Sequence, residues 1–579
     1  MIKKLLPSIG KYKLQAILSP VTIIFEVLLE VSLPLLMGNI IDIGVKNKDL
    51  NYIIVTGFTM IGMALLSLIF GASSGYFAAI ASSGFAKNLR ERMFAKIQSF
   101  SFANVDKFST GSLVMRVTQD VTNTQNAFQM MMRMLVRAPI MFVTATIMAV
   151  TINAKLSLIF LAVLPLLVLA IVLIASKAFP LFQKMMKAND SMNTTVQEGL
   201  IAIRVVKSFV RGDFENEKFK KSADDVRKAT INAEKLLVTN MPMMQLAMYI
   251  CMIMVFWFGA KMIVIGDMET GQLLSFISYI SQILMSLMMV SMVFVMLVLS
   301  KASASRIVEV LDEKIDLTDD NADPTLQVTD GSVEFNNVSF SYYKDKNNLT
   351  LRDATLKINS GETVGIIGGT GSSKTTLVQL IPRLYDVLDG EVKVGGRGVK
   401  EYKMKTLRDA VAMVLQKNVL FSGTIKENLK WGNEDATDDE ITEACKKAQA
   451  HNFIMSFPDG YETNLGQGGV NVSGGQKQRL CIARALIKKP KIIIFDDSTS
   501  AVDVATDAKI RSELKKNMIG MTIIIIAQRI SSVYDADRII VIDDGRINAI
   551  GTHEELLAGN EIYKEVYLSQ QSAQQKGDK

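Results

Sequence analysis

The stretch that decides the fold is TVGIIGGTGSSKTTLVQL, residues 363–380. Its first apolar residues predict a strand, the glycines predict a tight loop, and the apolar pattern after the loop predicts a helix. A phosphate-binding loop requires this strand–loop–helix context. The candidate nucleotide-binding residues of the loop are Gly368, Gly369, Thr370, Gly371, Ser372, Ser373, Lys374, Thr375 and Thr376.

In such a loop the backbone N–H groups point at the phosphates, and the helix N-terminus adds a favourable dipole. Lys374 is expected to meet the β- and γ-phosphates, and the Thr375 hydroxyl is expected to ligate Mg²⁺. The motif normally has glycine before the lysine, whereas this chain has Ser373. Because serine is small, we expect nucleotide binding to survive, and the conformation of the loop is the open question. By itself the loop predicts only that the chain binds a nucleoside triphosphate.

From Gly331 onward, short β-rich runs alternate with helical ones, which predicts an α/β domain with a largely parallel sheet. Asp496 ends one apolar run, from which its carboxylate can hold Mg²⁺ through water. The other runs of this kind are SVEFNNVSF (332–340), VAMVLQ (411–416) and MTIIIIAQ (521–528).

The rest of the chain has the composition of a membrane protein. The 579 residues are 49% hydrophobic and only 21% charged, with a mean hydropathy of +0.26. A membrane-spanning helix needs about 20 apolar residues. The expected spans are 14–45, 52–86, 125–154, 156–178, 236–260 and 271–300.

The loops between these spans differ in charge. The long segments 87–124 and 179–235 are rich in lysine and arginine. By the positive-inside rule both segments, both termini and the nucleotide-binding domain are cytoplasmic. The predicted organisation is an all-α transmembrane domain over 1–305, a linker over 306–328, an α/β nucleotide-binding domain over 329–569 and a disordered tail over 570–579.

Charge and composition exclude several classes of function. The net charge of +7 is modest and fits cytoplasmic loops of a membrane protein better than a nucleic-acid groove. The three cysteines lie far apart without metal-ligand spacing, so a disulfide framework and a zinc site are not expected. Two histidines in the whole chain also argue against chemistry that needs several imidazoles.

Further motifs around the phosphate loop resemble those of the ABC ATPases. Gln416 is similar to the Q-loop glutamine, which also contacts Mg²⁺, Tyr342 to the aromatic residue that stacks on adenine, and Asp503 to the end of the D-loop. In the family, an LSGGQ signature caps the γ-phosphate of ATP held by the opposite subunit. Its counterparts here are Val472, Ser473, Gly474, Gly475 and Gln476.

Together with the six spans, these motifs resemble an ABC exporter half-transporter. Since Asp497 and Gln528 stand where the family usually has glutamate and histidine, the chain resembles most of all the degenerate-site subunit of bacterial heterodimeric multidrug exporters. The resemblance implies a multi-pass protein of the bacterial cytoplasmic membrane that uses ATP and Mg²⁺. ATP would clamp two ATPase domains together, and coupling helices near 102–110 and 209–216 would transmit this closure to the spans.

Two catalytic positions depart from the family pattern. The family usually has glutamate, which polarises the attacking water, where this chain has Asp497. The shorter side chain withdraws the carboxylate by about 1.5 Å, and misplacement on this scale can cost about 10²-fold in rate. The family usually has histidine at the γ-phosphate where this chain has Gln528, which cannot carry a positive charge. We therefore expect a slow, ATP-retaining site; harmless drift is the alternative.

The intact signature predicts a particular partner. Sites in this family form head to tail, so a homodimer would contain two weakened sites. We expect instead a second, non-identical half-transporter that carries the glutamate and the histidine. No nucleic-acid partner is expected.

The substrate is less constrained by the sequence. Glu26 and Glu30 lie one turn apart in the first span, where unpaired charge is expensive. They can face a water-filled cavity and favour cationic amphiphiles, pair with Arg133 or Arg137, or lie near an aqueous lateral opening. We expect export of hydrophobic or amphiphilic, multidrug-like compounds across the lipid bilayer. Lipid or lipopeptide export and a chiefly regulatory ATP-binding subunit remain alternatives.

Overall fold

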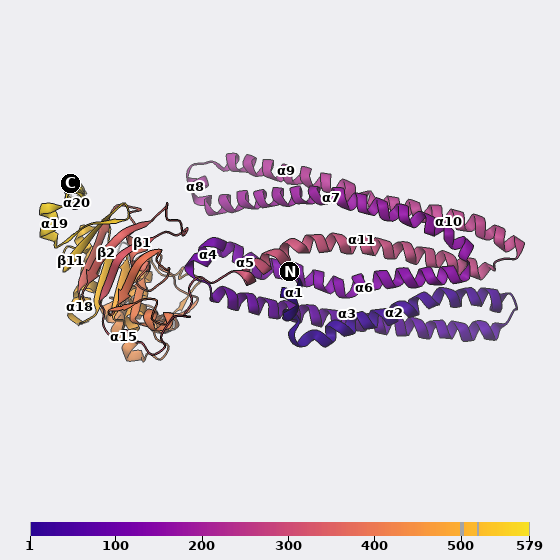
Figure 1. The fold of residues 1–579 in the computed structure, drawn as a ribbon, viewed down its shortest axis with the longest axis horizontal. Helices are drawn as coiled ribbons and strands as arrows, with labels where there is room; N and C mark the ends of the chain where they lie inside the picture. The colour runs from indigo at the N-terminus through magenta and orange to yellow at the C-terminus, as the bar shows by residue number, and fades with distance from the viewer. Residues whose placement is uncertain (1, 498–502, 518–519, 578–579) are drawn as a thin grey trace. The chain divides into compact units, whose positions relative to one another are not determined.

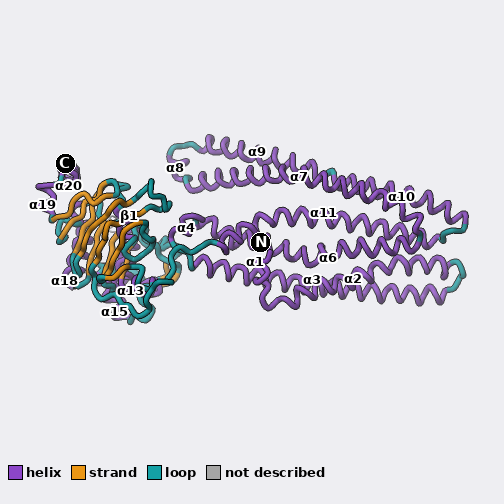
Figure 2. Tube along the Cα trace, in the orientation of Figure 1, coloured by secondary structure: helices purple, strands orange, loops and turns teal. Residues whose placement is uncertain are grey.

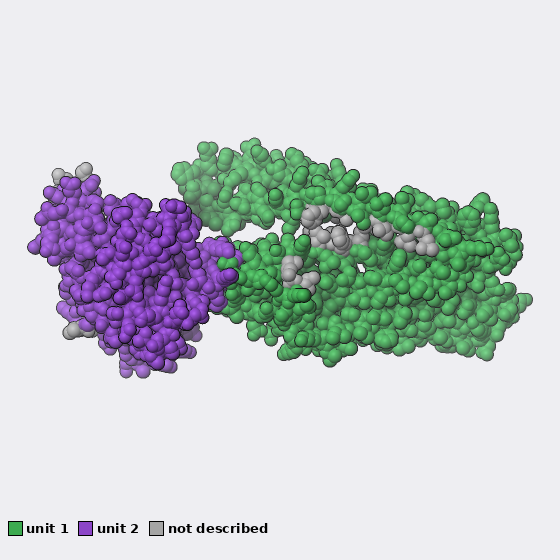
Figure 3. All heavy atoms as spheres, viewed as in Figure 1, with its two compact units in different colours: residues 1–98, 109–313 green, residues 99–108, 314–579 purple. Residues whose placement is uncertain are grey.

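The computed structural model describes residues 2–497, 503–517 and 520–577, and the chain forms two compact units (Figure 3). Unit 1 contains residues 1–98 and 109–313, and unit 2 contains residues 99–108 and 314–579. The division differs from the expected boundary at residue 305, because helix α11 (Thr270–Asp312) continues past it without a break. The short segment 99–108, expected in the membrane domain, belongs to unit 2.

Unit 1 is entirely helical in its described residues (Figures 1 and 2). Six stretches of these residues are long and apolar enough to cross a membrane, and they overlap the six predicted spans: Lys3–Val45, Leu50–Gln98, Thr110–Ile152, Ala154–Ile201, Gly212–Ile265 and Thr270–Val290. The other elements of the unit are α1 (Ile2–Leu5), η1 (Leu6–Tyr12), α2 (Lys13–Asn39), η2 (Ile40–Val45), α3 (Leu50–Gln98), α5 (Thr110–Met115), η3 (Arg116–Asp120), α6 (Val121–Ile152), α7 (Ala154–Ile201), α8 (Ile203–Ser208), α9 (Gly212–Val238) and α10 (Asn240–Ile265).

The long helices of unit 1 pack in two groups. Helices α2, α3, α6 and α11 pack on one another, while α7 runs beside α9 and α10 as a second group (Figure 1). Where the helices meet, the core includes Ile23, Val27, Phe160, Phe276 and Tyr279. The six apolar helices confirm the predicted fold class of this part.

The second coupling helix is expected near 209–216, but these residues do not form one continuous helix. Helix α8 ends at Ser208, and the Arg211 N–H bonds to the Val206 carbonyl at 2.9 Å. The Val210 N–H bonds to the Lys207 carbonyl at 3.3 Å, and Val210 has a φ of 54°. These two bonds form a Schellman motif, which ends a helix with a left-handed residue. The expected range is therefore a turn followed by the start of α9.

Glu26 and Glu30 of α2 both pair with Arg137 of α6. The two guanidinium nitrogens of Arg137 each bond one carboxylate, with 2.6 Å between Nη2 and Oε2 of Glu30. The Glu26 side chain is only 14% exposed. Of the three arrangements left open by the sequence, the structure shows pairing with Arg137, which offsets the cost of placing carboxylates inside a span.

Unit 2 is an α/β domain built on a six-stranded sheet in the order β12-β11-β3-β10-β9-β6. Strands β11, β3, β10, β9 and β6 are parallel, and β12 is antiparallel at one edge. This sheet confirms the predicted α/β class. The strands are β1 (Val333–Phe340), β2 (Leu351–Ile358), β3 (Thr363–Gly368), β4 (Asp389–Val394), β5 (Arg397–Gly398), β6 (Val411–Val414), β7 (Gly423–Thr424), β8 (Asn464–Leu465), β9 (Ile492–Asp496), β10 (Thr522–Ile526), β11 (Arg538–Asp543) and β12 (Arg546–Gly551).

Two smaller sheets complete the unit, one antiparallel in the order β2-β1-β4-β5 and one formed by β7 and β8. The helices are α4 (Phe102–Phe108), α12 (Lys374–Gln379), α13 (Met404–Ala410), α14 (Ile425–Lys430), α15 (Asp438–Lys447), α16 (His451–Met455), η4 (Gly460–Glu462), α17 (Gly474–Ile487), α18 (Val504–Asn517), η5 (Ile530–Ser532), α19 (His553–Gly559) and α20 (Glu561–Gly577).

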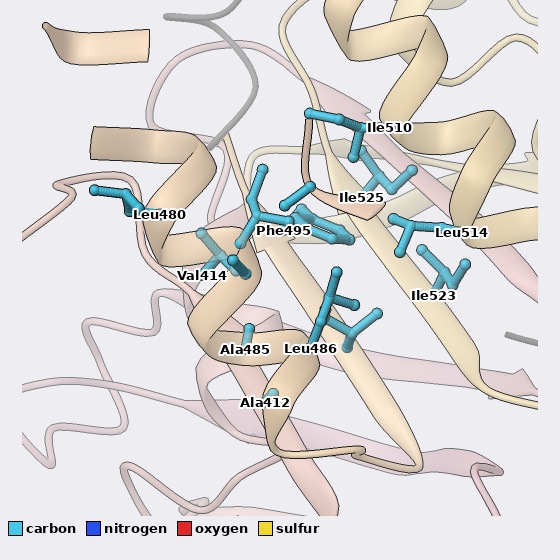
Figure 4. Packing of buried hydrophobic residues seen from close by; sticks show 14 of the residues in the cluster. Ala412, Val414, Leu480, Ala485, Leu486, Phe495, Ile510, Leu514, Ile523 and Ile525 are labelled. Atoms are coloured by element: carbon cyan, nitrogen blue, oxygen red, sulfur yellow. The ribbon is translucent and has the colours of Figure 1, made fainter. Parts of the chain in front are cut away.

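The main core of unit 2 lies between the parallel sheet and helices α17 and α18 (Figure 4). Leu486 of α17 and Leu514 of α18 belong to the same buried cluster as Phe495 and Ile523 of the sheet. Burying side chains of this size contributes about 1.5–3 kcal/mol each, so this core fixes the strands from which the site loops start.

The C-terminal tail also differs from expectation. Helix α20 continues through Gln570 to Gly577, whereas the sequence predicts disorder over 570–579. The run QQSAQQK has neither proline nor glycine, and most of its residues have good helix propensity. Residues 578–579 lie outside the described residues.

Replacing Arg137 with methionine is expected to destabilise the protein by about 3–5 kcal/mol, because two part-buried carboxylates lose the cation that they share. Thermal unfolding in lipid nanodiscs measures the loss. Adding Glu26→Gln and Glu30→Gln should recover most of it. The control is Lys218→Met, since Lys218 pairs with Glu198 at 3.1 Å on the surface and should matter little. Equal effects of Arg137→Met and Lys218→Met would contradict the importance of this ion triad.

Candidate functional site

The site is assembled at the carboxyl edge of the parallel sheet. Strands β3, β10 and β9 are neighbours, and Ile526 pairs with both Ile366 and Asp496. The loops that follow these strands therefore start side by side, which is where parallel α/β sheets bind ligands. The three loops carry the phosphate-binding residues, Asp497 and Gln528.

The phosphate-binding loop has the backbone that its glycines allow. A Cβ on Gly368 would lie 2.1 Å from the carbonyl oxygen of Ile542, so only glycine fits there. Gly371 has a φ of 82°. The Lys374 ammonium bonds to the carbonyl oxygens of Gly368 and Gly369 at 2.9 and 2.7 Å. Burial lowers the pKa of Lys374, while the nearby Asp497 and Asp496 oppose this shift. An incoming phosphate can take over these ammonium bonds.

Ser373 adopts the conformation for which the motif normally uses glycine. Its φ of 76° and ψ of 21° lie in the left-handed region. For residues other than glycine this region costs about 1–2 kcal/mol. The Ser373 hydroxyl donates a hydrogen bond to the Thr350 carbonyl at 2.7 Å, which offsets part of this cost. The loop thus keeps its conformation despite the substitution.

Thr375 and Asp496 form the pair that could hold a metal ion. The Thr375 hydroxyl donates to Oδ1 of Asp496 at 2.8 Å, and Asp496 is only 2% exposed. Burial raises the pKa of Asp496, and the neighbouring Asp497 raises it further. A hydroxyl and a carboxylate are hard oxygen ligands of the kind that Mg²⁺ prefers, and its charge would relieve the cost of burying Asp496. These residues therefore fit the expected ion.

The two departures from the family pattern are in direct contact. Gln528 Nε2 donates to Oδ2 of Asp497 at 2.6 Å. Gln416 Nε2 donates to the same oxygen at 3.3 Å. A carboxylate oxygen has two lone pairs, so these amides occupy both acceptor positions of Oδ2. This oxygen is then not available to orient an attacking water.

Tyr342 lies beside an aromatic cluster that the sequence does not identify. Its hydroxyl bonds to Thr376 Oγ1 at 2.9 Å, and its ring meets that of Tyr385 edge-on at 5.2 Å. Burial raises the pKa of Tyr342. Its ring is part-exposed, as a surface for stacking on a base must be.

Tyr385 connects this cluster to helix α4. The Tyr385 hydroxyl donates to Asp106 at 2.8 Å, and Phe102 lies 6.1 Å from the Tyr385 ring. Burial raises the pKa of Tyr385, and so does the bond to Asp106. These contacts explain why α4 belongs to unit 2. Asp106 and Tyr385 are 279 residues apart, so no local sequence signal pairs them.

The signature residues make hydrogen bonds that do not involve the phosphate-binding loop. Ser473 caps helix α17 in a capping box with Gln476. Among the described residues, no hydrogen bond joins 472–476 to 368–376. Asp503 accepts a bond from the Thr506 N–H at 2.9 Å. The rest of the D-loop, 500–502, lies outside the described residues.

Comparisons with known proteins agree with this architecture. Residues 16–288 match the family model of the ABC transporter transmembrane region, and residues 351–500 match the family model described as ABC transporter. The uncharacterized ABC transporter ATP-binding protein YfiB of Bacillus subtilis is 38% identical over 98% of both chains.

Two further proteins are similar over most of this chain. The putative multidrug export ATP-binding/permease protein YgaD of Bacillus subtilis is 34% identical, covering 86% of this chain and 85% of its own. A solved structure of a bacterial Atm1-family ABC exporter with ATP bound has the same fold. Its TM-score is 0.85 at 24% identity, and the match covers 97% of this chain and 99% of that one.

We expect Ser373→Gly to leave ATP affinity within about twofold, because glycine relieves the left-handed strain while one hydrogen bond is lost. Ser373→Val should weaken ATP binding by more than tenfold, since a β-branched residue is poorly tolerated at this φ. Fluorescent-nucleotide titration measures both affinities. If the valine variant binds ATP as well as the glycine variant does, the left-handed conformation of residue 373 is not required.

Proposed function

Since this chain belongs to the ABC transporter family and is an ATP-hydrolysing transporter with the exporter fold, we propose that it is the degenerate-site subunit of a heterodimeric exporter. The chain is a multi-pass membrane protein, and half-transporters of this family work as dimers within a membrane. In this proposal the nucleotide-binding domain spans 329–569, and the stretch that joins it to the transmembrane domain begins after α11 ends at Asp312 rather than at residue 306.

The observation that carries the proposal is the contact of Gln528 with Asp497 at 2.6 Å. The shortened carboxylate accepts the neutral amide instead of a water molecule. Gln528 also offers no positive charge to the charge that develops on the γ-phosphate. The groups proposed to bind ATP and Mg²⁺ are present, namely the phosphate-binding loop, Thr375 and Asp496. The site therefore binds Mg²⁺–ATP and turns it over slowly.

The signature gives the chain a second role in the dimer. Residues 472–476 open helix α17, and the N–H groups of Ser473 and Gln476 bond within its capping box. The N–H groups of Gly474 and Gly475 in the first turn are then the ones that can meet an anion at the helix N-terminus. In the head-to-tail dimer they complete the site of a non-identical partner, which carries the glutamate and the histidine. Bulk hydrolysis then takes place at the partner's phosphate loop, with this chain as a contributor.

For the transported compound we propose hydrophobic or amphiphilic, multidrug-like molecules. The similarity to a putative multidrug export protein of Bacillus subtilis supports this substrate class. We further propose that transport is outward, by alternating access across the bacterial cytoplasmic membrane, and the export named for that relative supports the direction. A role of Glu26 and Glu30 in the substrate pathway would require a compound that competes for their bonds to Arg137.

The test restores both family residues in this chain. In the complex with the partner's own site inactivated, Asp497→Glu combined with Gln528→His should raise single-turnover ATP hydrolysis by about 10²-fold. The reason is that the longer carboxylate reaches the attacking water and the imidazole can bear charge. Rapid-quench measurement of ADP formation gives the rate.

Ser373→Gly is the matched control, because it restores a family residue of the same site without touching the γ-phosphate pair. Its hydrolysis rate should stay at the starting level. An unchanged rate in the double variant would overturn the degenerate-site proposal.

A further inference from the structure

The loop that carries Gln528 is held from two sides by helices that lie outside the nucleotide motifs. On one side, Arg511 of α18 donates to the Ser531 carbonyl at 3.2 Å, and the Ser532 hydroxyl donates to Asp507 at 3.3 Å. On the other side stands Gln570 of helix α20.

Gln570 uses both ends of its side-chain amide on this loop. Its Oε1 accepts from the Ile530 N–H at 2.9 Å, and its Nε2 donates to the Gln528 carbonyl at 2.8 Å. A single side-chain amide thus bonds to the carbonyl of Gln528 and to the N–H of Ile530, as a neighbouring strand would. Backbone groups that leave a sheet need such partners.

The position of Gln570 is itself fixed by the packing of α20. Tyr563 lies seven residues earlier on the same face of the helix and is fully buried. Its hydroxyl bonds to Nδ1 of His553 at 2.7 Å. Val566 and Tyr567 also pack against the main core of unit 2. A rigid helix therefore presents the Gln570 amide to the loop.

We propose that Gln570 is a positioning residue for Gln528, and through it for the recognition of the γ-phosphate. Gln570 holds the backbone of Gln528, and the side chain of Gln528 holds Asp497. Releasing the loop lets both groups move away from the γ-phosphate position, while the contacts to adenine and to the other phosphates persist. Gln570 thereby helps the domain to distinguish a nucleoside triphosphate from a diphosphate. This inference rests on the proposed place of Gln528 at the γ-phosphate, but not on slow turnover.

The experiment compares two nucleotides in the full-length chain, purified in its natural assembly with the partner's phosphate loop inactivated. Gln570→Met removes both hydrogen bonds at nearly constant size. The ratio of the Kd for ADP to the Kd for a non-hydrolysable ATP analogue should fall about 3- to 10-fold. Hydrogen exchange over residues 527–534 should accelerate by a similar factor. Neither readout depends on the hydrolysis rate, so a failure here is distinct from a failure of the degenerate-site proposal.

The control is Gln571→Met on the next position of the same helix. In the part of the chain that the structure describes, Nε2 of Gln571 bonds only within α20, to Tyr567 at 2.7 Å. This variant should change neither the ratio nor the exchange. Should Gln570→Met fail to fold, Gln570→Asn keeps both amide groups with a shorter reach and should lower the ratio to a smaller extent. An unchanged ratio in the Gln570 variants, or equal weakening of both nucleotides, would overturn the inference.

Discussion

The parallel pairing of β3, β10 and β9 is the constraint on which the nucleotide site depends. All five side chains of β9 and all five of β10 are buried, so the sheet cannot shift without losing its core. Ile366, Ile526 and Asp496 lie in register, and their loops begin at one edge. The sheet thus brings together three loops that are far apart in sequence. The side chains at the ends of these strands then determine which ligands and which chemistry this edge of the sheet supports.

At that edge, binding and turnover depend on different residues. The phosphate-binding loop keeps its shape because the hydroxyl of Ser373 bonds to the Thr350 carbonyl, although serine is strained at this φ. Thr375 and Asp496 offer oxygens suited to Mg²⁺. The γ-phosphate side has changed instead, since Asp497 is occupied by the amides of Gln528 and Gln416. In the proposed heterodimer, this site retains ATP while the chain's signature serves the partner's site.

The sequence predicts those features whose signals are local. Apolar runs of membrane length predicted six spans, and short β-rich runs predicted the parallel sheet, because burial imposes a periodic pattern on each element. The sequence does not distinguish Arg133 from Arg137 as the partner of Glu26, since both arginines lie on one helix, a turn apart. Nor could it pair Tyr385 with Asp106, or Gln570 with the Gln528 loop. Such contacts join distant segments and leave no pattern in either one. The helix over 570–577 was missed because a polar composition is compatible with both disorder and a helix.

Steady-state ATPase activity of the purified assembly tests the proposed asymmetry between the two ATP sites most directly. Lys374→Ala weakens this chain's own site, whereas Ser473→Asp keeps the cap of α17 and places a carboxylate against the γ-phosphate of the partner's site. We expect the lysine variant to keep most of the activity and the aspartate variant to lose more than about 90%, a tenfold change. Equal losses in the two variants would mean two equivalent sites and would overturn the proposed asymmetry.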